Sequence, residues 1–347
     1  MSRVLDLGEV PAADFFPSAT DPVGPDEASH PLAMDVCHGC GLAQLADDDT
    51  ITEEPRGVEP QALKNQAEAA IKQVAADGCL RGDTVLEFGS PHGGTWIPML
   101  IERGFSEASS QADVVLDSFG VMHEPDQRGA FVRRAQVTSP SGVLLMQYHS
   151  IATIVCEGQW NALRHGHFAY YSLTTLTRLL RAVGMRILRA WEFDLYGGTV
   201  MLAAAHGQAE PDESVRRILA IEDELGITTP EAITSLQQRA DDHAESLRSW
   251  LQEEAEAGRT VFAYGAASRA VALFSRARID SRYLAAVADA SPAKQGRRMP
   301  GTDIPIVSPC ELLAAKPDRV LVMIPDLLPE VSAQFPELEG RWKVASS

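Results

Sequence analysis

The stretch TVLEFGSPHGG, residues 84–94, decides the fold of the middle of this chain. It begins as an apolar run of strand length, reaches an acid and a glycine, and passes through a glycine-rich turn into a helical stretch, residues 95–103. Two further buried-strand candidates, residues 112–120 and 141–150, flank a helical segment at 125–135. Strands that alternate with helices in this way predict a parallel α/β sheet.

Other helix and strand signals extend this central domain on both sides. Apolar residues recur at helical spacing over 61–76, and Ser172 is a good N-cap for a helix that Gly184 ends. Two apolar runs, 185–193 and 199–205, flank a turn and predict a pair of strands. These segments favour a single α/β domain from residue 59 to residue 208.

A second strand, turn and helix unit opens near the C-terminus with RTVFAYGAASRA, residues 259–270. Strand candidates follow at 283–289 and 319–325, which predicts a smaller Rossmann-like domain over 259–347. Residues 209–258 are charged and helical, with a break near Thr228 to Pro230, and we expect them to connect domains rather than to fill a core. Residues 1–58 are rich in Pro, Asp and Gly without a sustained period, which predicts a small irregular lobe.

Composition excludes several classes of function. The 347 residues carry a formal charge of −18, which repels phosphate backbones and anionic lipid surfaces, so we expect neither nucleic acid nor membrane as a partner. No apolar run reaches the roughly 18 residues that a membrane helix needs, and the N-terminus does not read as a signal peptide. We therefore predict a cytoplasmic protein. Its cysteines should be thiols or a metal pair rather than disulfides: Cys37, Cys40, Cys79, Cys156 and Cys310.

Two turns are candidate ligand sites. Gly89, Gly93 and Gly94 would let a ligand approach the start of a helix, although a tight turn between packed elements would need the same glycines. The YGAAS turn, 264–268, is followed at a strand end by Asp289 and so imitates a dinucleotide fingerprint. It lacks the three glycines, so a nicotinamide-dependent oxidoreductase is a weaker alternative.

Basic and histidine side chains are the remaining candidates. The tract KQGRR, 294–298, could hold a diphosphate near Ser268 and Arg269, or could be a solvated loop. His123 follows a strand at the edge where open α/β sheets bind ligands, and His167 precedes a helix. A neutral imidazole can take a proton from a carbon beside a carbonyl, and local hydrogen bonding is the alternative role.

Several segments together resemble the sugar C-methyltransferase family, which methylates a carbon beside the ketone of nucleotide-linked deoxy-keto-sugars. They run in family order across nearly the whole chain, and the last is the most specific: LDLG (5–8), CHGCGLAQL (37–45), LEFGS (86–90), VMHEP (121–125), HFAYYSLTTL (167–176), YGGTV (196–200), YGAAS (264–268) and PAKQGRRMPGTDIPI (292–306). The resemblance implies a zinc-binding N-terminal domain, a central methyltransferase domain that uses S-adenosylmethionine, and a Rossmann-like C-terminal domain. It places the substrate, a nucleotide-diphosphate sugar, between the last two.

The resemblance also implies roles for individual residues. His167 would be the base and His123 a second proton-handling or polarising group. Glu87 would lie near the methionine amino group of S-adenosylmethionine, with Gly89, Gly93 and Gly94 forming the rest of the cradle. The candidates for substrate contacts are Tyr264, Ser268, Arg269, Lys294 and Arg297, and the candidates for the metal are Cys37 and Cys40.

Departures from the family pattern qualify these roles. Only the second of two Cys-x-x-Cys pairs is present, so half of a zinc site is expected and bound zinc is not. Arg164 and Gly166 replace a tyrosine and a glutamate before His167. Between residues 105 and 112 the chain lacks a strand, a helix and a further strand that bind the ribose and adenine, so we expect a rearranged central sheet and a degraded cofactor site. The alternative function is therefore a non-catalytic or repurposed homologue that binds the sugar nucleotide without methyl transfer.

Overall fold

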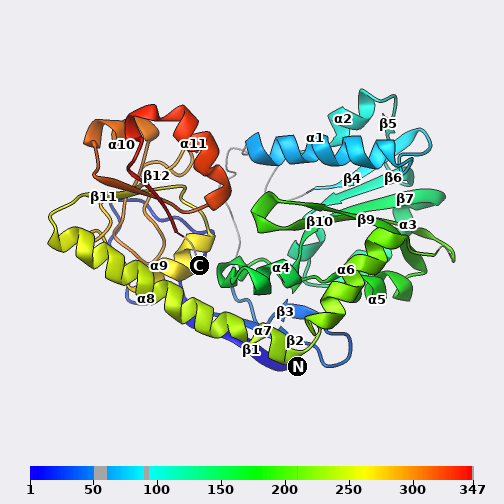
Figure 1. The fold of residues 1–347 in the computed structure, drawn as a ribbon, viewed down its shortest axis with the longest axis horizontal. Helices are drawn as coiled ribbons and strands as arrows, with labels where there is room; N and C mark the ends of the chain where they lie inside the picture. Colours follow the sequence, from blue (N-terminus) through cyan, green and yellow to red (C-terminus); the bar gives the residue numbers. More distant parts are fainter. Residues whose placement is uncertain (51–60, 90–93, 209, 346–347) are drawn as a thin grey trace.

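The computed structural model describes residues 1–50, 61–89, 94–208 and 210–345, arranged around three β-sheets (Figure 1). The central six-stranded sheet has the order β5-β4-β6-β7-β10-β9. Its strands are β4 (Thr84–Phe88), β5 (Ser106–Glu107), β6 (Ala112–Ser118), β7 (Thr138–His149), β9 (Met185–Phe193) and β10 (Thr199–His206). The predicted alternation is confirmed, because β5, β4, β6 and β7 pair in parallel, while β10 lies antiparallel between β7 and β9.

Helices cover both faces of the central sheet (Figure 1). On one face lie α1 (Gln61–Ala76) and α2 (Ile97–Ile101), and on the other lie α3 (Gln127–Val137), α5 (Leu173–Ala182) and α6 (Glu213–Glu224). The apolar positions that predicted α1 include Ala70, Ile71 and Val74, and all three are buried. Ser172 caps α5 through the backbone N–H of Thr175, as its sequence predicted.

The expected rearrangement of the central sheet was wrong. After α2, the chain forms the two-residue strand β5 on the outer edge of β4 before it passes to β6 on the other side. Strand β5 pairs only with Thr84 and Val85, at the start of β4. A helix that leads from β4 to this short strand avoids the disfavoured direct crossover to β6.

The N-terminal lobe is more regular than its composition predicted. Three of its strands, β1 (Ser2–Val10), β2 (His30–Val36) and β3 (Ala43–Leu45), form an antiparallel sheet in the order of the chain. The fourth strand, β8 (Ala169–Tyr170), comes from the central part of the chain and pairs with β3. Within the described part of the lobe, the long connection over 11–29 fits the predicted irregular structure.

The C-terminal sheet is fully parallel and has the order β13-β12-β11-β14-β15. Its elements are β11 (Val261–Tyr264), α9 (Arg269–Ala277), β12 (Ala286–Ala288), β13 (Ile306–Val307), α10 (Pro309–Ala315), β14 (Arg319–Val322), α11 (Leu328–Gln334) and β15 (Trp342–Val344). The strand order reverses between β11 and β14, and open α/β sheets bind ligands beyond the carboxyl ends of their strands at such a point.

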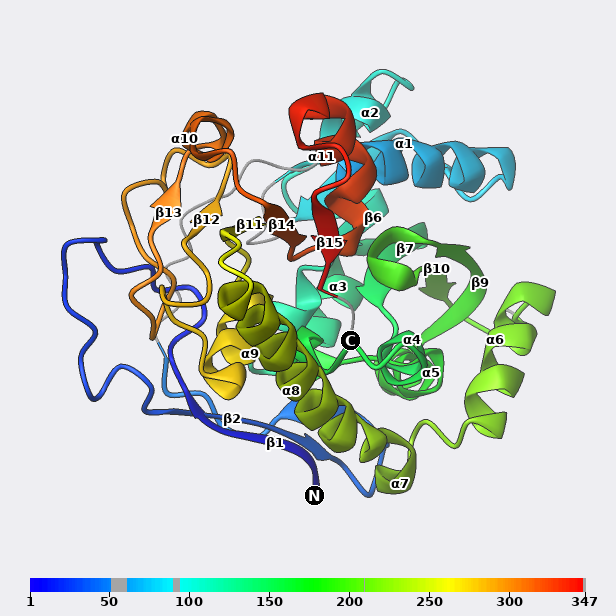
Figure 2. The same cartoon turned by 60° about the vertical axis from the view of Figure 1, so that its left-hand side comes forward.

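The charged helical stretch does more than connect domains. It breaks at Pro230 as predicted, into α6, the short α7 (Pro230–Ile233) and the long α8 (Ser235–Glu256). One face of α8 is buried in the core shared by β1 and α9, with Leu236, Ala240, Leu247 and Leu251 among the buried residues. Figure 2 shows α8 alongside α9, so this helix belongs to the core, contrary to our expectation.

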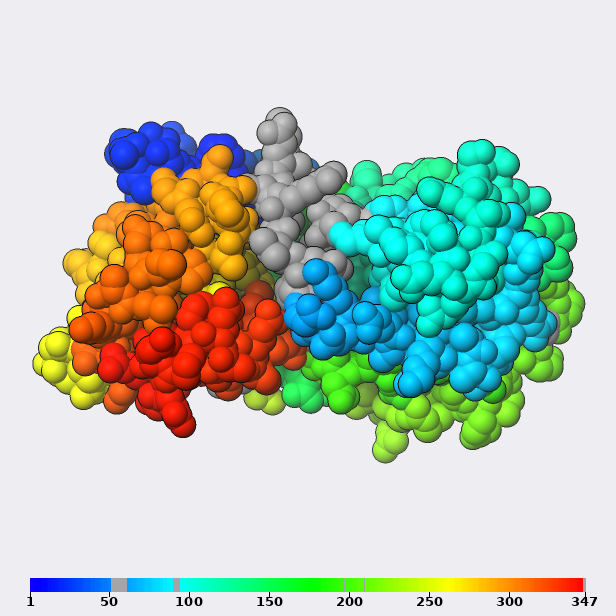
Figure 3. Space-filling model, turned by 90° about the horizontal axis from the view of Figure 1, so that it is seen from above, coloured from blue at the N-terminus to red at the C-terminus, as the bar shows by residue number. Residues whose placement is uncertain are grey.

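Seen from above, the central and C-terminal parts form two bodies side by side (Figure 3). The N-terminal lobe and α8 lie beneath both of them (Figure 1). Within the described ranges, the chain forms no helix with the length and apolar character needed to span a bilayer.

Candidate active site

Two histidines that are far apart in the sequence meet beyond the carboxyl end of β6. His123 ends the short 3₁₀ helix η1 (Val121–His123), and His167 lies just before β8. Their rings are edge to face, with centroids 4.5 Å apart and planes at 85°. His167 is buried, with 8% of its surface exposed, and His123 is half-buried. The two residues that the sequence singled out as proton-handling groups thus lie in one place.

The hydrogen bonds of the pair determine where its protons lie. His123 donates from Nδ1 to the carbonyl oxygen of Gly166 at 3.0 Å, so Nε2 is its basic nitrogen. Burial, and after it the charge of Arg164, lowers the pKa of His123 to about 4. His123 is therefore neutral near pH 7. The Nε2 atom of His167 accepts a hydrogen bond from Nε of Arg164 at 2.7 Å, which directs its lone pair toward the guanidinium group.

The N-terminal lobe and η1 both hold the segment that carries His167. The backbone N–H of Gly166 donates to Asp48 Oδ2 at 2.7 Å, and His165 Nε2 donates to the carbonyl oxygen of Pro31 at 3.2 Å. On the other side, Phe168 N donates to the carbonyl oxygen of Met122 at 2.7 Å. His165 therefore anchors the segment to the lobe.

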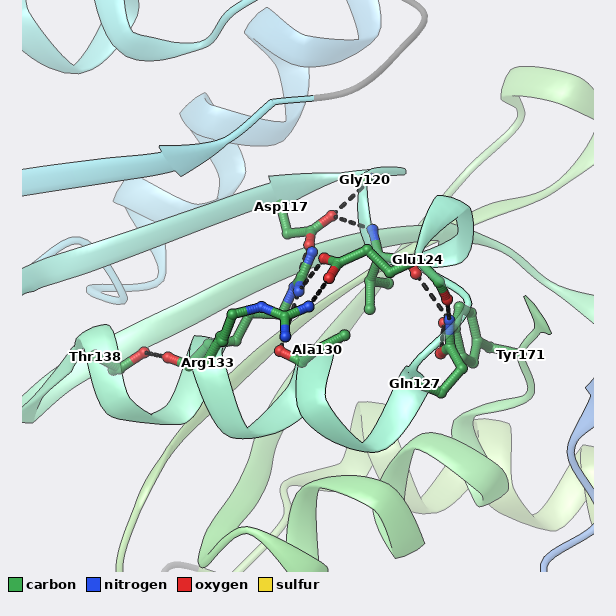
Figure 4. A network of polar contacts seen from close by, with 10 residues as sticks. Asp117, Gly120, Glu124, Gln127, Ala130, Arg133, Thr138 and Tyr171 are labelled. Atoms are coloured by element: carbon green, nitrogen blue, oxygen red, sulfur yellow. Dashed lines mark hydrogen bonds and ion pairs between the residues drawn. The ribbon is translucent and has the colours of Figure 1, made fainter. Parts of the chain in front are cut away.

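A buried ionic network positions η1 and, with it, His123 (Figure 4). Asp117, near the end of β6, accepts hydrogen bonds from the backbone N–H groups of Gly120 at 2.7 Å and Val121 at 3.1 Å. Its other oxygen pairs with Arg134 of α3, which also reaches Glu124 at 2.6 Å. Asp117 and Arg134 are each 1% exposed, and a buried charge that loses its partner is strongly destabilising.

None of the residues in this network was predicted from the sequence as a site residue. The available signal was an acid inside a strand that is otherwise apolar, since a buried carboxylate needs a partner. The periodicity of α3 does not show which of its arginines turns inward, so the partner of Asp117 follows only from the fold.

The predicted cofactor turn joins β4 to α2. Glu87 Oε1 accepts a hydrogen bond from the backbone N–H of Trp96 at 2.8 Å, and its other oxygen accepts one from the hydroxyl of Thr95. Burial raises the pKa of Glu87. Glu87 therefore holds the start of α2, and a ligand ammonium group would have to share it. Gly89 follows β4, Gly94 has a φ of +79°, which favours glycine, and Gly93 lies outside the described residues.

The structure describes few residues on the β5 side of this turn, where the ribose of S-adenosylmethionine would lie. The acid of β5, Glu107, pairs with Val85, three residues before β4 ends at Phe88. At about 3.3 Å per residue, Glu107 therefore lies roughly 10 Å short of the carboxyl edge. The described residues fit the methionine part of S-adenosylmethionine, but they provide no acid for its ribose on the β5 side of β4.

The basic tract of the C-terminal domain, residues 294–298, contacts the N-terminal lobe. Lys294 is 6% exposed and donates to the carbonyl oxygen of Ala266 at 2.9 Å, and its ammonium group lies 4.8 Å from the ring centroid of Phe16. Arg297 is exposed and donates to the carbonyl oxygen of Phe16 at 2.7 Å. Arg298 forms a bidentate pair with Glu27. A phosphate group would have to compete with these contacts.

Contacts with other residues of the C-terminal domain hold the YGAAS turn, residues 264–268, in place. Tyr264 is buried against Phe335, with ring centroids 5.6 Å apart, and burial raises its pKa to about 12. Asp289 accepts a hydrogen bond from Ala266 N at 2.7 Å, so its carboxylate holds the turn. This contact does not favour the nicotinamide alternative. Ser268 is buried just before α9, and Arg269 lines a pocket between the two bodies.

Cys37 and Cys40 lie on the turn between β2 and β3. Gly41 N donates to the carbonyl oxygen of Cys37 at 2.8 Å, which closes the turn. Backbone N–H groups of Cys40 and Gly39 lower the pKa of the Cys37 thiol, whereas burial raises that of Cys40. Among the residues with a described placement, no cluster of three or more His, Cys, Asp or Glu could hold a metal ion.

We expect the purified chain to bind zinc at well below one atom per chain. Two cysteines supply half of the four ligands that a structural zinc site needs. Elemental analysis of the protein, with Cys37→Ser as the control, checks this expectation. One tightly held zinc per chain that is lost in Cys37→Ser would contradict it.

Comparison with known proteins shows which proteins this chain is similar to. Residues 194–344 match the family model of the C-methyltransferase C-terminal domain. The chain is 24% identical over 391 residues to the C-methyltransferase NovU of Streptomyces niveus, covering 98% of this chain and 92% of that protein. This alignment is longer than the 347 residues of the chain, so the relative contains segments that this chain lacks.

Solved structures of methyltransferases are also similar to part of the chain. The magnesium protoporphyrin IX methyltransferase of Synechocystis PCC 6803 with bound SAH is 12% identical, with a TM-score of 0.30, over 42% of this chain and 84% of that chain. The 1,6-didemethyltoxoflavin-N1-methyltransferase of Burkholderia thailandensis, also solved with S-adenosylhomocysteine, is 12% identical, with a TM-score of 0.30, over 48% of this chain and 96% of that chain.

Proposed function

We propose that this chain, which is similar to C-methyltransferases, is a C-methyltransferase that acts on a carbon beside the ketone of a nucleotide-linked keto-sugar or a related natural-product intermediate. The observation that carries the proposal is the pair of His123 and buried His167, whose rings meet beyond the carboxyl end of β6. A neutral imidazole beside a second polar group is suited to the removal of a proton next to a carbonyl.

In this proposal His167 is the base. S-adenosylmethionine, when bound, supplies an electrophilic methyl group. His167 takes the α-proton at Nε2, the nitrogen that Arg164 now occupies, so the substrate has to draw the guanidinium group away. The electron pair of the broken C–H bond forms the carbon–carbon double bond of an enolate, and the π pair of the carbonyl group moves onto the ketone oxygen, where Arg164 can stabilise the developing charge. Neutral His123 donates its one N–H to Gly166, so it can take part only by accepting a proton at Nε2.

The substrate contacts are part of the same proposal. Ser268, Arg269 and Arg297 lie at the carboxyl edge of the C-terminal sheet or on its basic tract, and the exposed guanidinium group of Arg297 is suited to a diphosphate. Tyr264 and Lys294 are buried, and they would support the site by shaping the YGAAS turn. We also propose a cytoplasmic location, because the five cysteines are free thiols, which a reducing compartment preserves.

The second candidate is a homologue that binds the sugar nucleotide without methyl transfer. The short β5 and the engagement of Glu87 with α2 favour it, because both weaken the fit to S-adenosylmethionine. Both candidates bind the same sugar nucleotide, but only the first converts it to a methylated product.

Incubation with S-adenosylmethionine and thymidine-diphosphate 4-keto-6-deoxyglucose, followed by mass spectrometry, tests the proposal. We expect a product that is heavier by one methyl group in place of a hydrogen, and none with His167→Ala. Binding of the sugar nucleotide without this product would support the second candidate. Absence of both binding and product would overturn the proposed substrate class.

A further inference from the structure

A pocket of about 300 Å³ lies between the two bodies of the protein. One wall follows α4 (Ile151–Cys156) and the 3₁₀ helices η2 (Trp160–Ala162) and η3 (Leu195–Gly197). The other wall comes from α8, the start of α9 and the carboxyl ends of β14 and β15. The pocket therefore lies at the switch point of the C-terminal sheet, and its volume suits one ring-sized group.

His243 of α8 lines this pocket, and its hydrogen-bonding is incomplete. The residue is 5% exposed, and the indole N–H of Trp160 donates to its Nδ1 at 3.2 Å. An indole can only donate, so Nδ1 has to accept and the imidazole proton lies on Nε2. Nε2 is buried and meets no partner among the residues that the structure describes. His243 thus presents a buried N–H donor that lacks an acceptor.

The charge around this donor limits which ligand would suit it. Burial lowers the pKa of His243 to about 4, so the ring is neutral near pH 7. The pocket also exposes the acids Glu157 and Asp326, with Arg269 as its basic residue. A diphosphate would meet repulsion from both acids, whereas an uncharged carbonyl oxygen can accept from His243 without a charge penalty.

We propose that this pocket binds an uncharged ring whose carbonyl oxygen accepts a hydrogen bond from Nε2–H of His243. The inference rests on the proposed function, because a keto-sugar nucleotide offers two such rings, the nucleobase and the keto-sugar. Nε2 is covered in this structure, so the ligand oxygen reaches it after a side-chain movement in the wall, for example of the partly exposed Asn161. Trp160 then acts as a positioning residue, since its indole holds the imidazole in the required tautomer.

Two substitutions test the donor directly. His243→Phe keeps a buried ring and removes the N–H, whereas His243→Gln keeps a donor near the position of Nε2 and an acceptor for Trp160. We expect His243→Phe to weaken binding by about 5- to 150-fold, the range for an unpaired buried acceptor, and His243→Gln to restore most of it. Thermal unfolding without ligand, measured for both variants, separates loss of the donor from loss of stability.

Calorimetry with two probes distinguishes the two rings. Thymidine diphosphate carries only the base, and thymidine-diphosphate 4-keto-6-deoxyglucose carries both rings. If the nucleobase occupies the pocket, His243→Phe weakens the binding of both probes equally. If the keto-sugar occupies it, His243→Phe weakens only the binding of thymidine-diphosphate 4-keto-6-deoxyglucose. Equal affinities in wild type and His243→Phe, or no binding of either probe to the wild type, would overturn the inference. Binding that depends on His243 without methyl transfer would keep the inference and remove only the catalytic part of the proposed function.

Discussion

Replacement of His167 by alanine is expected to slow the exchange of substrate α-protons with deuterated water by about 10²- to 10⁴-fold, the usual contribution of a general base. Substrate affinity should stay nearly unchanged, because the imidazole acts on a C–H bond and adds little to binding. Loss of the substrate α-proton signal, followed by NMR in deuterated water, measures the rate. His38→Ala is a matched control, since His38 is exposed on the N-terminal lobe.

Arg164 offers a second measurement on the same histidine pair. Its guanidinium group donates to His167 Nε2, and its charge lowers the pKa of His123. Arg164→Met should therefore raise the pKa of His123, which NMR titration of the imidazole signals measures. An unchanged pKa of His123 in Arg164→Met would contradict this electrostatic role of Arg164. Undiminished exchange in His167→Ala would transfer the role of base to His123.

Affinity for S-adenosylmethionine is expected to be weak by calorimetry, so methyl transfer should require a high concentration of S-adenosylmethionine. Adenosine recognition ordinarily uses an acid that accepts hydrogen bonds from both ribose hydroxyls, and each such bond to a charged group contributes roughly 1.5 to 3 kcal/mol. Because β5 ends level with Val85, that acid is absent from the described edge of β4. The affinity should fall by at least about tenfold for each lost bond.

L-Methionine provides the control for this expectation. A site that recognises only the methionine part should bind methionine and S-adenosylmethionine within about tenfold of each other, a difference of 1.4 kcal/mol. Glu87→Gln should weaken both ligands alike, since Glu87 lies at the methionine end of the turn in our proposal. Micromolar or tighter binding of S-adenosylmethionine would contradict the degraded site and support an ordinary methyltransferase. Binding of NADH instead would favour the oxidoreductase alternative.

The sequence by itself determined the local elements of this protein, because their signals lie within a few residues of one another. Apolar residues at helical spacing gave the bounds of α1, Ser172 marked the start of α5, and Pro230 marked the break before α8. The alternation of apolar runs with glycine turns predicted both parallel sheets, since each strand of such a sheet is buried on both faces. The resemblance to the sugar C-methyltransferases predicted His167 as the base and His123 as a second proton-handling or polarising group.

Only the tertiary structure decided which distant segments pair. Strand β8 joins the N-terminal sheet, and Arg134 pairs with Asp117. Lys294, which the sequence suggested as a phosphate ligand, donates a hydrogen bond to a backbone carbonyl oxygen. Each of these contacts depends on backbone atoms or buried charges that find their partners only when the chain is folded, because a local pattern does not encode the partner of a hydrogen bond. The unpartnered N–H of His243 appears for the same reason, since its environment is built by three elements that are remote in the sequence.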